Sequence, residues 1–135
     1  MYISKIAIEN FRLFGSGAHA FTLALNPGLT ALVGENDAGK TAVIDAIRLV
    51  LGTRDQELLR IDTADFHQAA GDQDRADQIL IRLHFRELTL VDRGAFAEYL
   101  TYEQNGDEAD TTLIITWEVK RNTKENSSRR TLPPE

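Results

Sequence analysis

Four stretches of this chain place large apolar side chains at every second position, which is the pattern of a half-buried β-strand. The stretches cover residues 3–9, 21–25, 79–85 and 113–119. The first two are separated only by residues 10–20, a segment that contains three small turn-forming residues. A loop this short has no room for a crossover helix, so we expect these two strands to pair antiparallel.

Residues 41–51 have the period of an α-helix, because their larger apolar side chains recur three and four positions apart. The remaining positions are mostly alanine and leucine, so we expect this helix to be largely buried, with Gly52 as its C-terminal cap. Seven residues before this helix, residues 29–33 read Leu-Thr-Ala-Leu-Val. A short apolar run of this kind suits a strand that is buried on both faces of a mainly parallel sheet.

The C-terminal half predicts a second helix over residues 89–102, with Thr89 as N-cap and Asp92 completing an imperfect capping box. The tripeptide at residues 105–107, Asn-Gly-Asp, is a turn signal. Residues 121–135 contain one sizeable apolar side chain, Leu132, and end in a Pro-Pro-Glu sequence. We therefore expect one lobe over residues 1–120 and a polar linker or disordered tail over residues 121–135.

An octapeptide between the predicted strand 29–33 and the helix 41–51 fits the phosphate-loop pattern G-x-x-x-x-G-K-[ST]. It consists of Gly34, Glu35, Asn36, Asp37, Ala38, Gly39, Lys40 and Thr41. Backbone N–H groups of such a loop, together with the positive end of the following helix, form an anion site. Lys40 is expected to reach the β- and γ-phosphates, and Thr41 to place its hydroxyl on Mg²⁺. ATP and Mg²⁺ are therefore the predicted ligands.

Composition limits the other possibilities. With 135 residues, of which 42% are hydrophobic and 27% charged, the chain is expected to form one globular domain with a modest core. Its net charge of −6 argues against a surface coated for nucleic-acid binding. The absence of cysteine excludes disulfides and Cys-ligated zinc within the chain. We see no signal peptide and no apolar run long enough for a bilayer, so we expect a cytoplasmic protein with no membrane partner.

Residues 3–52 are more specific than a bare phosphate loop, and they resemble the N-terminal lobe of ABC-type ATPases of the SMC and RecF class. The matching elements are the tripeptides Asn10-Phe11-Arg12 and Asp45-Ala46-Ile47 and, within the octapeptide, Asn36. The resemblance implies an α/β P-loop NTPase fold, in which a mixed β-sheet surrounds a central helix and this chain forms the first lobe.

Within that class, three features look most like the OLD (overcoming lysogenization defect) family. They are the octapeptide, Asp65-Phe66, and residues 81–88, which read Ile-Arg-Leu-His-Phe-Arg-Glu-Leu. Members of this family are ATPases whose C-terminal half carries a Toprim nuclease, and they act on DNA, often in phage defence. The resemblance covers residues 1–120 and is strongest over residues 1–52.

The resemblance also assigns roles to individual residues. Arg12 would lie against the nucleotide phosphates from the side of the first strand. The Q-loop, which contacts Mg²⁺ or the attacking water, would be represented by Asp65 or Gln68, and the sequence does not choose between them. The three histidines, His19, His67 and His84, stand apart in the sequence, and we interpret them as loop or strand-face residues rather than metal ligands.

Motifs that ABC-type hydrolysis requires are missing from the chain: a Ser-Gly-Gly signature, and a strand that ends in Asp-Glu. A Toprim-like acidic cluster is missing as well. In this class two heads sandwich the nucleotide, so we expect a piece of a longer protein that forms a head-to-head homodimer, binds DNA and is inactive as this chain alone. Three interpretations stay open: an OLD-type nuclease lobe, an SMC- or RecF-like repair ATPase without nuclease, and a regulatory module that binds nucleotide without hydrolysing it.

Overall fold

The computed structural model describes residues 1–35, 39–52, 60–105 and 108–121 of the chain. Within these ranges the strands are β1 (Tyr2–Glu9), β2 (Phe21–Ala24), β3 (Gln78–Arg86), β4 (Leu100–Asn105) and β5 (Glu108–Lys120). The α-helices are α1 (Lys40–Leu51) and α2 (Leu90–Ala95), and short 3₁₀ turns cover Gly17–His19, Thr63–Asp65 and Ala97–Tyr99. None of the described helices is long and apolar enough to span a membrane.

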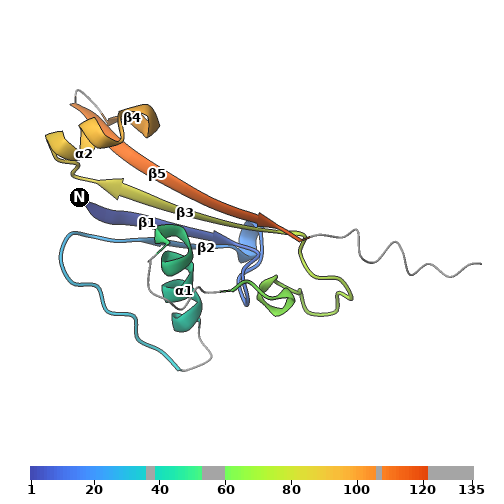
Figure 1. The fold of residues 1–135 in the computed structure, drawn as a ribbon. Coiled ribbons are helices and arrows are strands. Elements are labelled where there is room, and N and C mark those ends of the chain that lie inside the picture. The colour runs from blue at the N-terminus through green and yellow to red at the C-terminus, as the bar shows by residue number, and fades with distance from the viewer. Residues whose placement is uncertain (36–38, 53–59, 106–107, 122–135) are drawn as a thin grey trace, which may run out of the picture.

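The five described strands form one sheet in the order β2-β1-β3-β5-β4, in which every pair of neighbours is antiparallel. In Figure 1, α1 packs against one face of the twisted sheet beside β1 and β2, and α2 lies next to β4. The four strands predicted from an alternating pattern are confirmed, and β1 and β2 pair antiparallel as expected. The α/β fold class is confirmed as well.

The core lies between the sheet and α1. In the central strands the inward positions are closed to solvent: Ile6 is 1% exposed, and Ile81 and Leu83 are 0% exposed. From the helix side, Ala42 and Ala46 complete the same cluster. Small alanine side chains let the helix approach the sheet closely, so one strip of α1 is sealed.

The expectation that α1 is largely buried is wrong. Ile44 is 49% exposed and Leu51 is 46% exposed, although both are apolar. Only one side of the helix meets the sheet, and no described element covers the other side (Figure 1). The helix itself was predicted correctly, and Gly52 caps it in the left-handed conformation, with its N–H bonded to the carbonyl oxygen of Arg48.

The predicted strand at residues 29–33 does not form in the structure. Leu29 is 99% exposed and Val33 is 92% exposed. The mainly parallel sheet expected around this segment is also absent from the described residues, where all strand pairs are antiparallel. A strand needs neighbours that accept and donate its backbone hydrogen bonds, and no described strand pairs with this one.

The second helix is shorter than predicted, because α2 ends at Ala95 and residues 100–105 form β4 instead. Its start was predicted well: the hydroxyl of Thr89 accepts a bond from the Asp92 N–H, and the Asp92 carboxylate accepts one from the Thr89 N–H. Pairing with β5 overrides the local helical pattern. Residues 106 and 107 of the predicted turn lie outside the described residues, but Asn105 and Glu108 pair on either side of it.

Most of the predicted tail, residues 122–135, lies outside the described residues. Its first residue is attached to the lobe. The backbone N–H of Arg121 donates to the carbonyl oxygen of Asp77 at 2.7 Å, and its guanidinium donates to the Asp77 carboxylate at 3.2 Å.

Candidate phosphate-binding site

The second glycine of the octapeptide shapes the start of α1. Gly39 is the N-cap residue, with φ 95° and ψ 7°, a left-handed conformation that glycine adopts without strain. A Cβ atom at this position would lie 2.9 Å from the Phe14 side chain. Gly39 has no side chain that could cap the helix, so the N-cap residue itself leaves the N–H groups of the first turn for an anion. Asn36, Asp37 and Ala38 lie outside the described residues.

Lys40 joins the two ends of the loop. It is the first residue of α1, and its ammonium group donates a hydrogen bond to the carbonyl oxygen of Gly34. Thr41, one position further along the helix, is exposed to solvent. The cation and the hydroxyl of the motif therefore both lie at the N-terminal end of α1, where the helix dipole favours negative charge.

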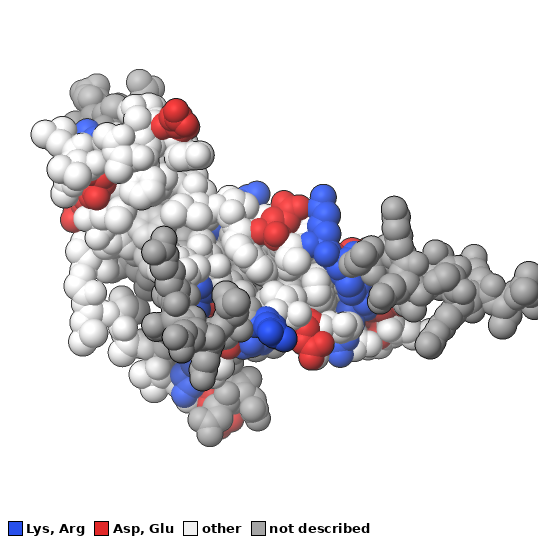
Figure 2. All heavy atoms as spheres, in the orientation of Figure 1, with Lys and Arg blue, Asp and Glu red and all other residues white. Residues whose placement is uncertain are grey.

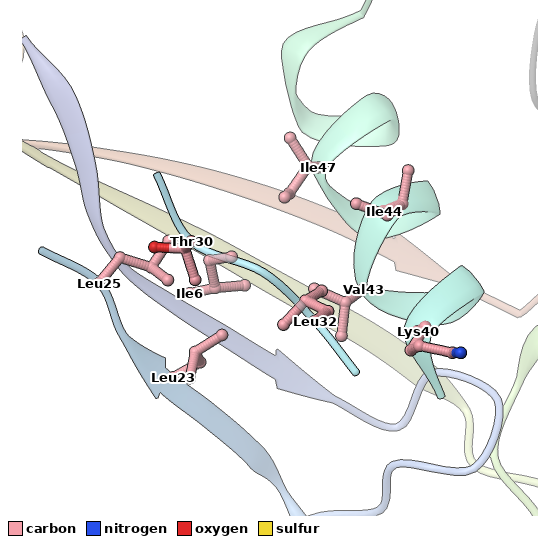
Figure 3. Close-up of a pocket in the computed structure, with 9 residues that line it drawn as sticks. All are labelled: Ile6, Leu23, Leu25, Thr30, Leu32, Lys40, Val43, Ile44 and Ile47. Atoms are coloured by element: carbon pink, nitrogen blue, oxygen red, sulfur yellow. The ribbon is translucent and has the colours of Figure 1, made fainter. Parts of the chain in front are cut away.

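Next to Lys40, a groove of about 380 Å³ runs between the sheet and α1. Apart from Lys40 and Thr30 its walls are aliphatic, with Ile6 and Leu23 from the sheet and Ile44 from the helix among them. The segment before the loop passes along this groove, and the Lys40 ammonium group is directed away from the apolar side chains (Figure 3). The groove can therefore accommodate an apolar group, whereas a phosphate belongs at the helix end beside it.

Arg12 lies between two carboxylates, one from α1 and one from the loop that follows it. Its Nη1 is 2.6 Å from Asp45 Oδ2, and its Nε is 3.0 Å from Asp65 Oδ1. Partial burial tends to lower the pKa of Arg12, but hydrogen bonds and opposite charges from both carboxylates outweigh this and raise the pKa. The guanidinium thus connects the end of β1 to α1 and to residues 62–65.

The backbone around Arg12 strengthens this connection. Arg12 has φ 53°, and its N–H donates to the carbonyl oxygen of Asp65 at 2.7 Å. Its own carbonyl oxygen accepts a bond from His67 Nδ1 at 2.7 Å. Because a carbonyl only accepts, Nδ1 carries the proton in this contact. His67 is therefore a positioning residue for this turn rather than the isolated loop residue that the sequence suggested.

The two Q-loop candidates differ in how their polar atoms are used. Asp65 is fully engaged, because Oδ1 accepts from Arg12 and Oδ2 accepts from the Asp62 N–H at 2.8 Å. Gln68 is exposed, and its amide nitrogen donates to the carbonyl oxygen of Asp72 at 2.9 Å. The Gln68 side chain can therefore turn toward a ligand at a lower cost than the Asp65 carboxylate.

Sequence reasoning missed the role of Asp45 as the main partner of Arg12. Asp45 is only 8% exposed, and Arg48 lies 3.6 Å from its other oxygen. The available signal was that Asp45 is the single acidic residue of the helix and has apolar neighbours on both sides, Ile44 and Ala46. A buried carboxylate in such a position is nearly always paired.

The described residues contain no group of three or more histidine, aspartate or glutamate side chains that could hold a metal ion. Of the three histidines, His19 ends a 3₁₀ turn and His84 lies on β3.

Comparisons with known proteins give a matching family and several similar proteins. The model of a family described as AAA domain matches residues 5–133. The chromosome partition protein Smc of Chlorobaculum tepidum is 50% identical over 60 residues, which are 44% of this chain and 5% of that protein. Smc of Aquifex aeolicus is 32% identical over 87 residues, covering 64% of this chain and 7% of that protein.

The DNA replication and repair protein RecF of Herpetosiphon aurantiacus is 33% identical over 70 residues, which are 47% of this chain and 17% of that protein. A solved structure from work on ATP-driven dimerization and DNA-stimulated activation of SMC ATPases has a similar fold, with a TM-score of 0.60 and 24% identity. It covers 89% of this chain and 64% of the solved chain. The chain thus spans a small fraction of the length of the Smc proteins that it matches.

Proposed function

The chain belongs to the AAA domain family, and we propose that it is the ATP-binding lobe of an ATPase that acts on DNA. The observation that carries this proposal is the N-terminal end of α1. There the left-handed N-cap Gly39, the N–H groups of the first helical turn and the Lys40 ammonium group are the elements that a phosphate site requires. The similarity to Smc and RecF proteins supports the connection to DNA.

In the proposed complex, N–H groups of residues 34–41 and of the first helical turn hold the phosphates. Lys40 would exchange its bond to the Gly34 carbonyl for a phosphate oxygen, and Thr41 would bind Mg²⁺. We also propose that Arg12 contacts the nucleotide phosphates from the side of β1. It would then have to release Asp45 or Asp65, since both carboxylates now bind it.

For the Q-loop we propose Gln68 rather than Asp65. Both oxygens of Asp65 are already bonded, to Arg12 and to the Asp62 N–H, so recruiting them would break the turn that positions Arg12. Gln68 would exchange only one exposed hydrogen bond. Loss of Mg²⁺-dependent affinity in Gln68→Ala, with less effect in Asp65→Asn, would agree with this choice, and the reverse order would refute it.

Calorimetry with ATP and Mg²⁺ on the full chain tests the binding proposal. The expected result is binding by the wild-type protein and no measurable binding by Lys40→Ala, while the control Lys120→Ala, an exposed lysine at the end of β5, retains wild-type affinity. Thr41→Ala should weaken binding in Mg²⁺ more than in EDTA. Wild-type affinity in Lys40→Ala would refute the assignment of the loop.

The activity of the whole protein is a separate proposal, because this chain matches only 5% of the length of the Chlorobaculum Smc protein. We propose that two copies of the lobe face each other across ATP in a homodimer, and that a longer polypeptide carrying this lobe hydrolyses ATP. The narrower proposal is an OLD-type enzyme with an added DNA endonuclease, based on the octapeptide and on residues 81–88. The similarity to Smc and RecF supports the alternative, an ATPase without nuclease.

A DNA nicking assay on the longer polypeptide separates these two proposals. ATP- and Mg²⁺-dependent nicking that Lys40→Ala abolishes would support the OLD-type enzyme, with its proposed role in phage defence. DNA-stimulated ATP hydrolysis without nicking would support the repair-type ATPase. ATP binding without any turnover would support a regulatory module.

A further inference from the structure

The sheet has a second depression, of about 350 Å³, that involves neither α1 nor residues 34–41. Lys5 and His84 form part of its wall, and they are directly paired across β1 and β3. Their neighbours along the strands, Ile6 and Leu83, point into the core beneath α1. Because side chains alternate along a strand, this pocket lies on the sheet face opposite α1.

The polar groups of this pocket are mainly hydrogen-bond donors or cations. Lys5 is exposed and has no ion-pair partner among the described residues. Arg86 forms an ion pair with Asp110, and a guanidinium can serve more than one acceptor. None of the described lining residues is an aspartate or a glutamate, although the Asp110 carboxylate pairs with Arg86. The described lining therefore carries two cationic side chains, one of them already paired with a carboxylate.

One buried hydroxyl in the wall lacks a hydrogen-bond partner. Thr112 is 2% exposed, and within the part of the chain that the structure describes its Oγ1 bonds to no protein atom. Leaving a buried polar group unpaired costs about 1–3 kcal/mol. Such a group in a native protein requires an explanation, and a ligand rich in acceptor oxygens would supply one.

A local irregularity of β1 shapes the same place. The register with β3 shifts between Ile3 and Lys5, so that Ser4 occupies a bulge. The Ser4 hydroxyl donates to the carbonyl oxygen of His84 at 3.2 Å, and its own carbonyl oxygen accepts a bond from the Leu25 N–H at 2.8 Å. Bulges redirect side chains and are common beside binding sites.

We propose that this pocket binds a phosphate group, with Lys5, Arg86 and Thr112 as the principal contacts. The same chemistry could come from a free phosphate or phosphate ester or from the backbone of DNA. On the face shown in Figure 2, positive and negative side chains are interspersed, and no continuous basic surface is visible there. The pocket differs from that face because its charged side chains are all of one sign.

Inorganic phosphate titrated into the ¹⁵N-labelled full chain tests this inference by NMR. The amides of Lys5, His84 and Thr112 report on the pocket, whereas those of Gly39 and Thr41 report on the phosphate loop, and Lys40→Ala removes the contribution of the loop. The expected result is a saturable shift of the pocket amides that persists in Lys40→Ala. If the loop proposal fails, only the shifts of the Gly39 and Thr41 amides are lost. If the pocket proposal fails, only the shifts of the Lys5, His84 and Thr112 amides are lost, so the two failures are distinguishable.

Three variants sharpen the test. Lys5→Gln should weaken phosphate binding at the pocket about tenfold. Thr112→Val, which keeps the shape of the side chain and removes the hydroxyl, should weaken it severalfold while circular dichroism shows an unchanged fold. The matched control is Arg82→Gln, an exposed cation on β3 outside the pocket, which should leave the affinity unchanged.

A short DNA duplex then identifies the source of the phosphate. Shifts of the same pocket amides by the duplex, weakened by Lys5→Gln more than by Arg82→Gln, would assign the pocket to the DNA backbone. Shifts by inorganic phosphate alone would assign it to small phosphate anions. Absence of shifts with both probes, or equal losses in Lys5→Gln and Arg82→Gln, would overturn the proposal.

Discussion

Strand β3 and the segment at residues 29–33 are both apolar and both have the composition of a β-strand, but only β3 forms one. β3 lies between β1 and β5, and Ile79, Ile81 and Leu83 are each 0% exposed. No described strand pairs with residues 29–33, and Leu29 is 99% exposed. The comparison shows that strand composition is only half of the requirement: neighbours must also satisfy the backbone.

The two segments also differ in the kind of sheet that they call for. β3 pairs antiparallel with strands from both halves of this chain, so its partners are all present. The composition of residues 29–33 is that of a strand buried on both faces of a parallel sheet. The apolar side chains of this segment are exposed to solvent, and the octapeptide begins directly after it.

Hydrogen exchange should reveal the largest difference between the two segments. Amides in the middle of β3 are expected to exchange at least about a thousandfold more slowly than those of residues 29–33, because opening β3 requires unfolding of the lobe. Mass spectrometry on short peptides or NMR can measure both segments in one sample. Similar protection in the two segments would mean that residues 29–33 have found a partner, and the comparison would fail.

A matched pair of leucine truncations tests the same contrast energetically. Leu83→Ala should lower the free energy of unfolding by about 3 kcal/mol, since it leaves a cavity in the core. Leu29→Ala should lower it by less than about 0.5 kcal/mol, because its side chain is already in water. Urea denaturation measures both changes. If Leu83→Ala does not fold, Ile81→Val, expected to cost about 1 kcal/mol, replaces it.

Arg12 connects the end of β1 to α1 and to residues 62–65. We expect its removal to lower the free energy of unfolding by less than Leu83→Ala does. Arg12→Ala is expected to cost about 1–2 kcal/mol, because Asp45 and Asp65 both lose their closest cation. Arg48→Ala, which removes the more distant cation at 3.6 Å from Asp45, should cost less than about 0.5 kcal/mol. Equal losses in urea denaturation would show that Arg12 is not the main link.

The smallest effect is expected at the N-terminus of α2, where Thr89 is exposed to solvent. Hydrogen bonds from the backbone N–H and the hydroxyl of Thr89 lower the pKa of Asp92. The ionised Asp92 carboxylate therefore stabilises the folded state above the usual aspartate pKa, and this stabilisation is lost as the pH falls through the lowered pKa of Asp92. Thr89→Ala should raise the pKa of Asp92 part of the way back, because the backbone donor remains.

An NMR titration of the Asp92 carboxyl group measures this change, with Thr101→Ala on β4 as the control. An unchanged Asp92 pKa in Thr89→Ala would contradict the role of the hydroxyl.

Much of the fold was accessible from the sequence because it depends on short-range patterns. The four strands with an alternating pattern, the helix α1 and its Gly52 cap follow from periodicity and from the conformational freedom of glycine. The helix predicted over residues 89–102 was only partly right, since residues 100–105 pair with β5 instead. That outcome depends on a partner strand, which a local pattern does not contain.

The candidate site divides in the same way. The octapeptide identifies the residues that would contact phosphate, because glycine, lysine and threonine at these spacings serve one chemical purpose. The sequence did not reveal that Arg12 would be held by Asp45 and Asp65, or that His67 would bond to the carbonyl of Arg12. These residues are 33 to 55 positions apart from Arg12 in the chain.

The sequence by itself therefore determined the phosphate loop, the helix that follows it and the alternating strands, since each depends on residues within one turn or one strand. Only the tertiary structure decided which apolar runs were buried, which carboxylates engaged Arg12, and that cations and an unpaired Thr112 hydroxyl share one pocket. The physical reason is that burial and ion pairing depend on neighbours from distant parts of the chain. Residues 29–33 remain exposed because no described strand supplies such a neighbour.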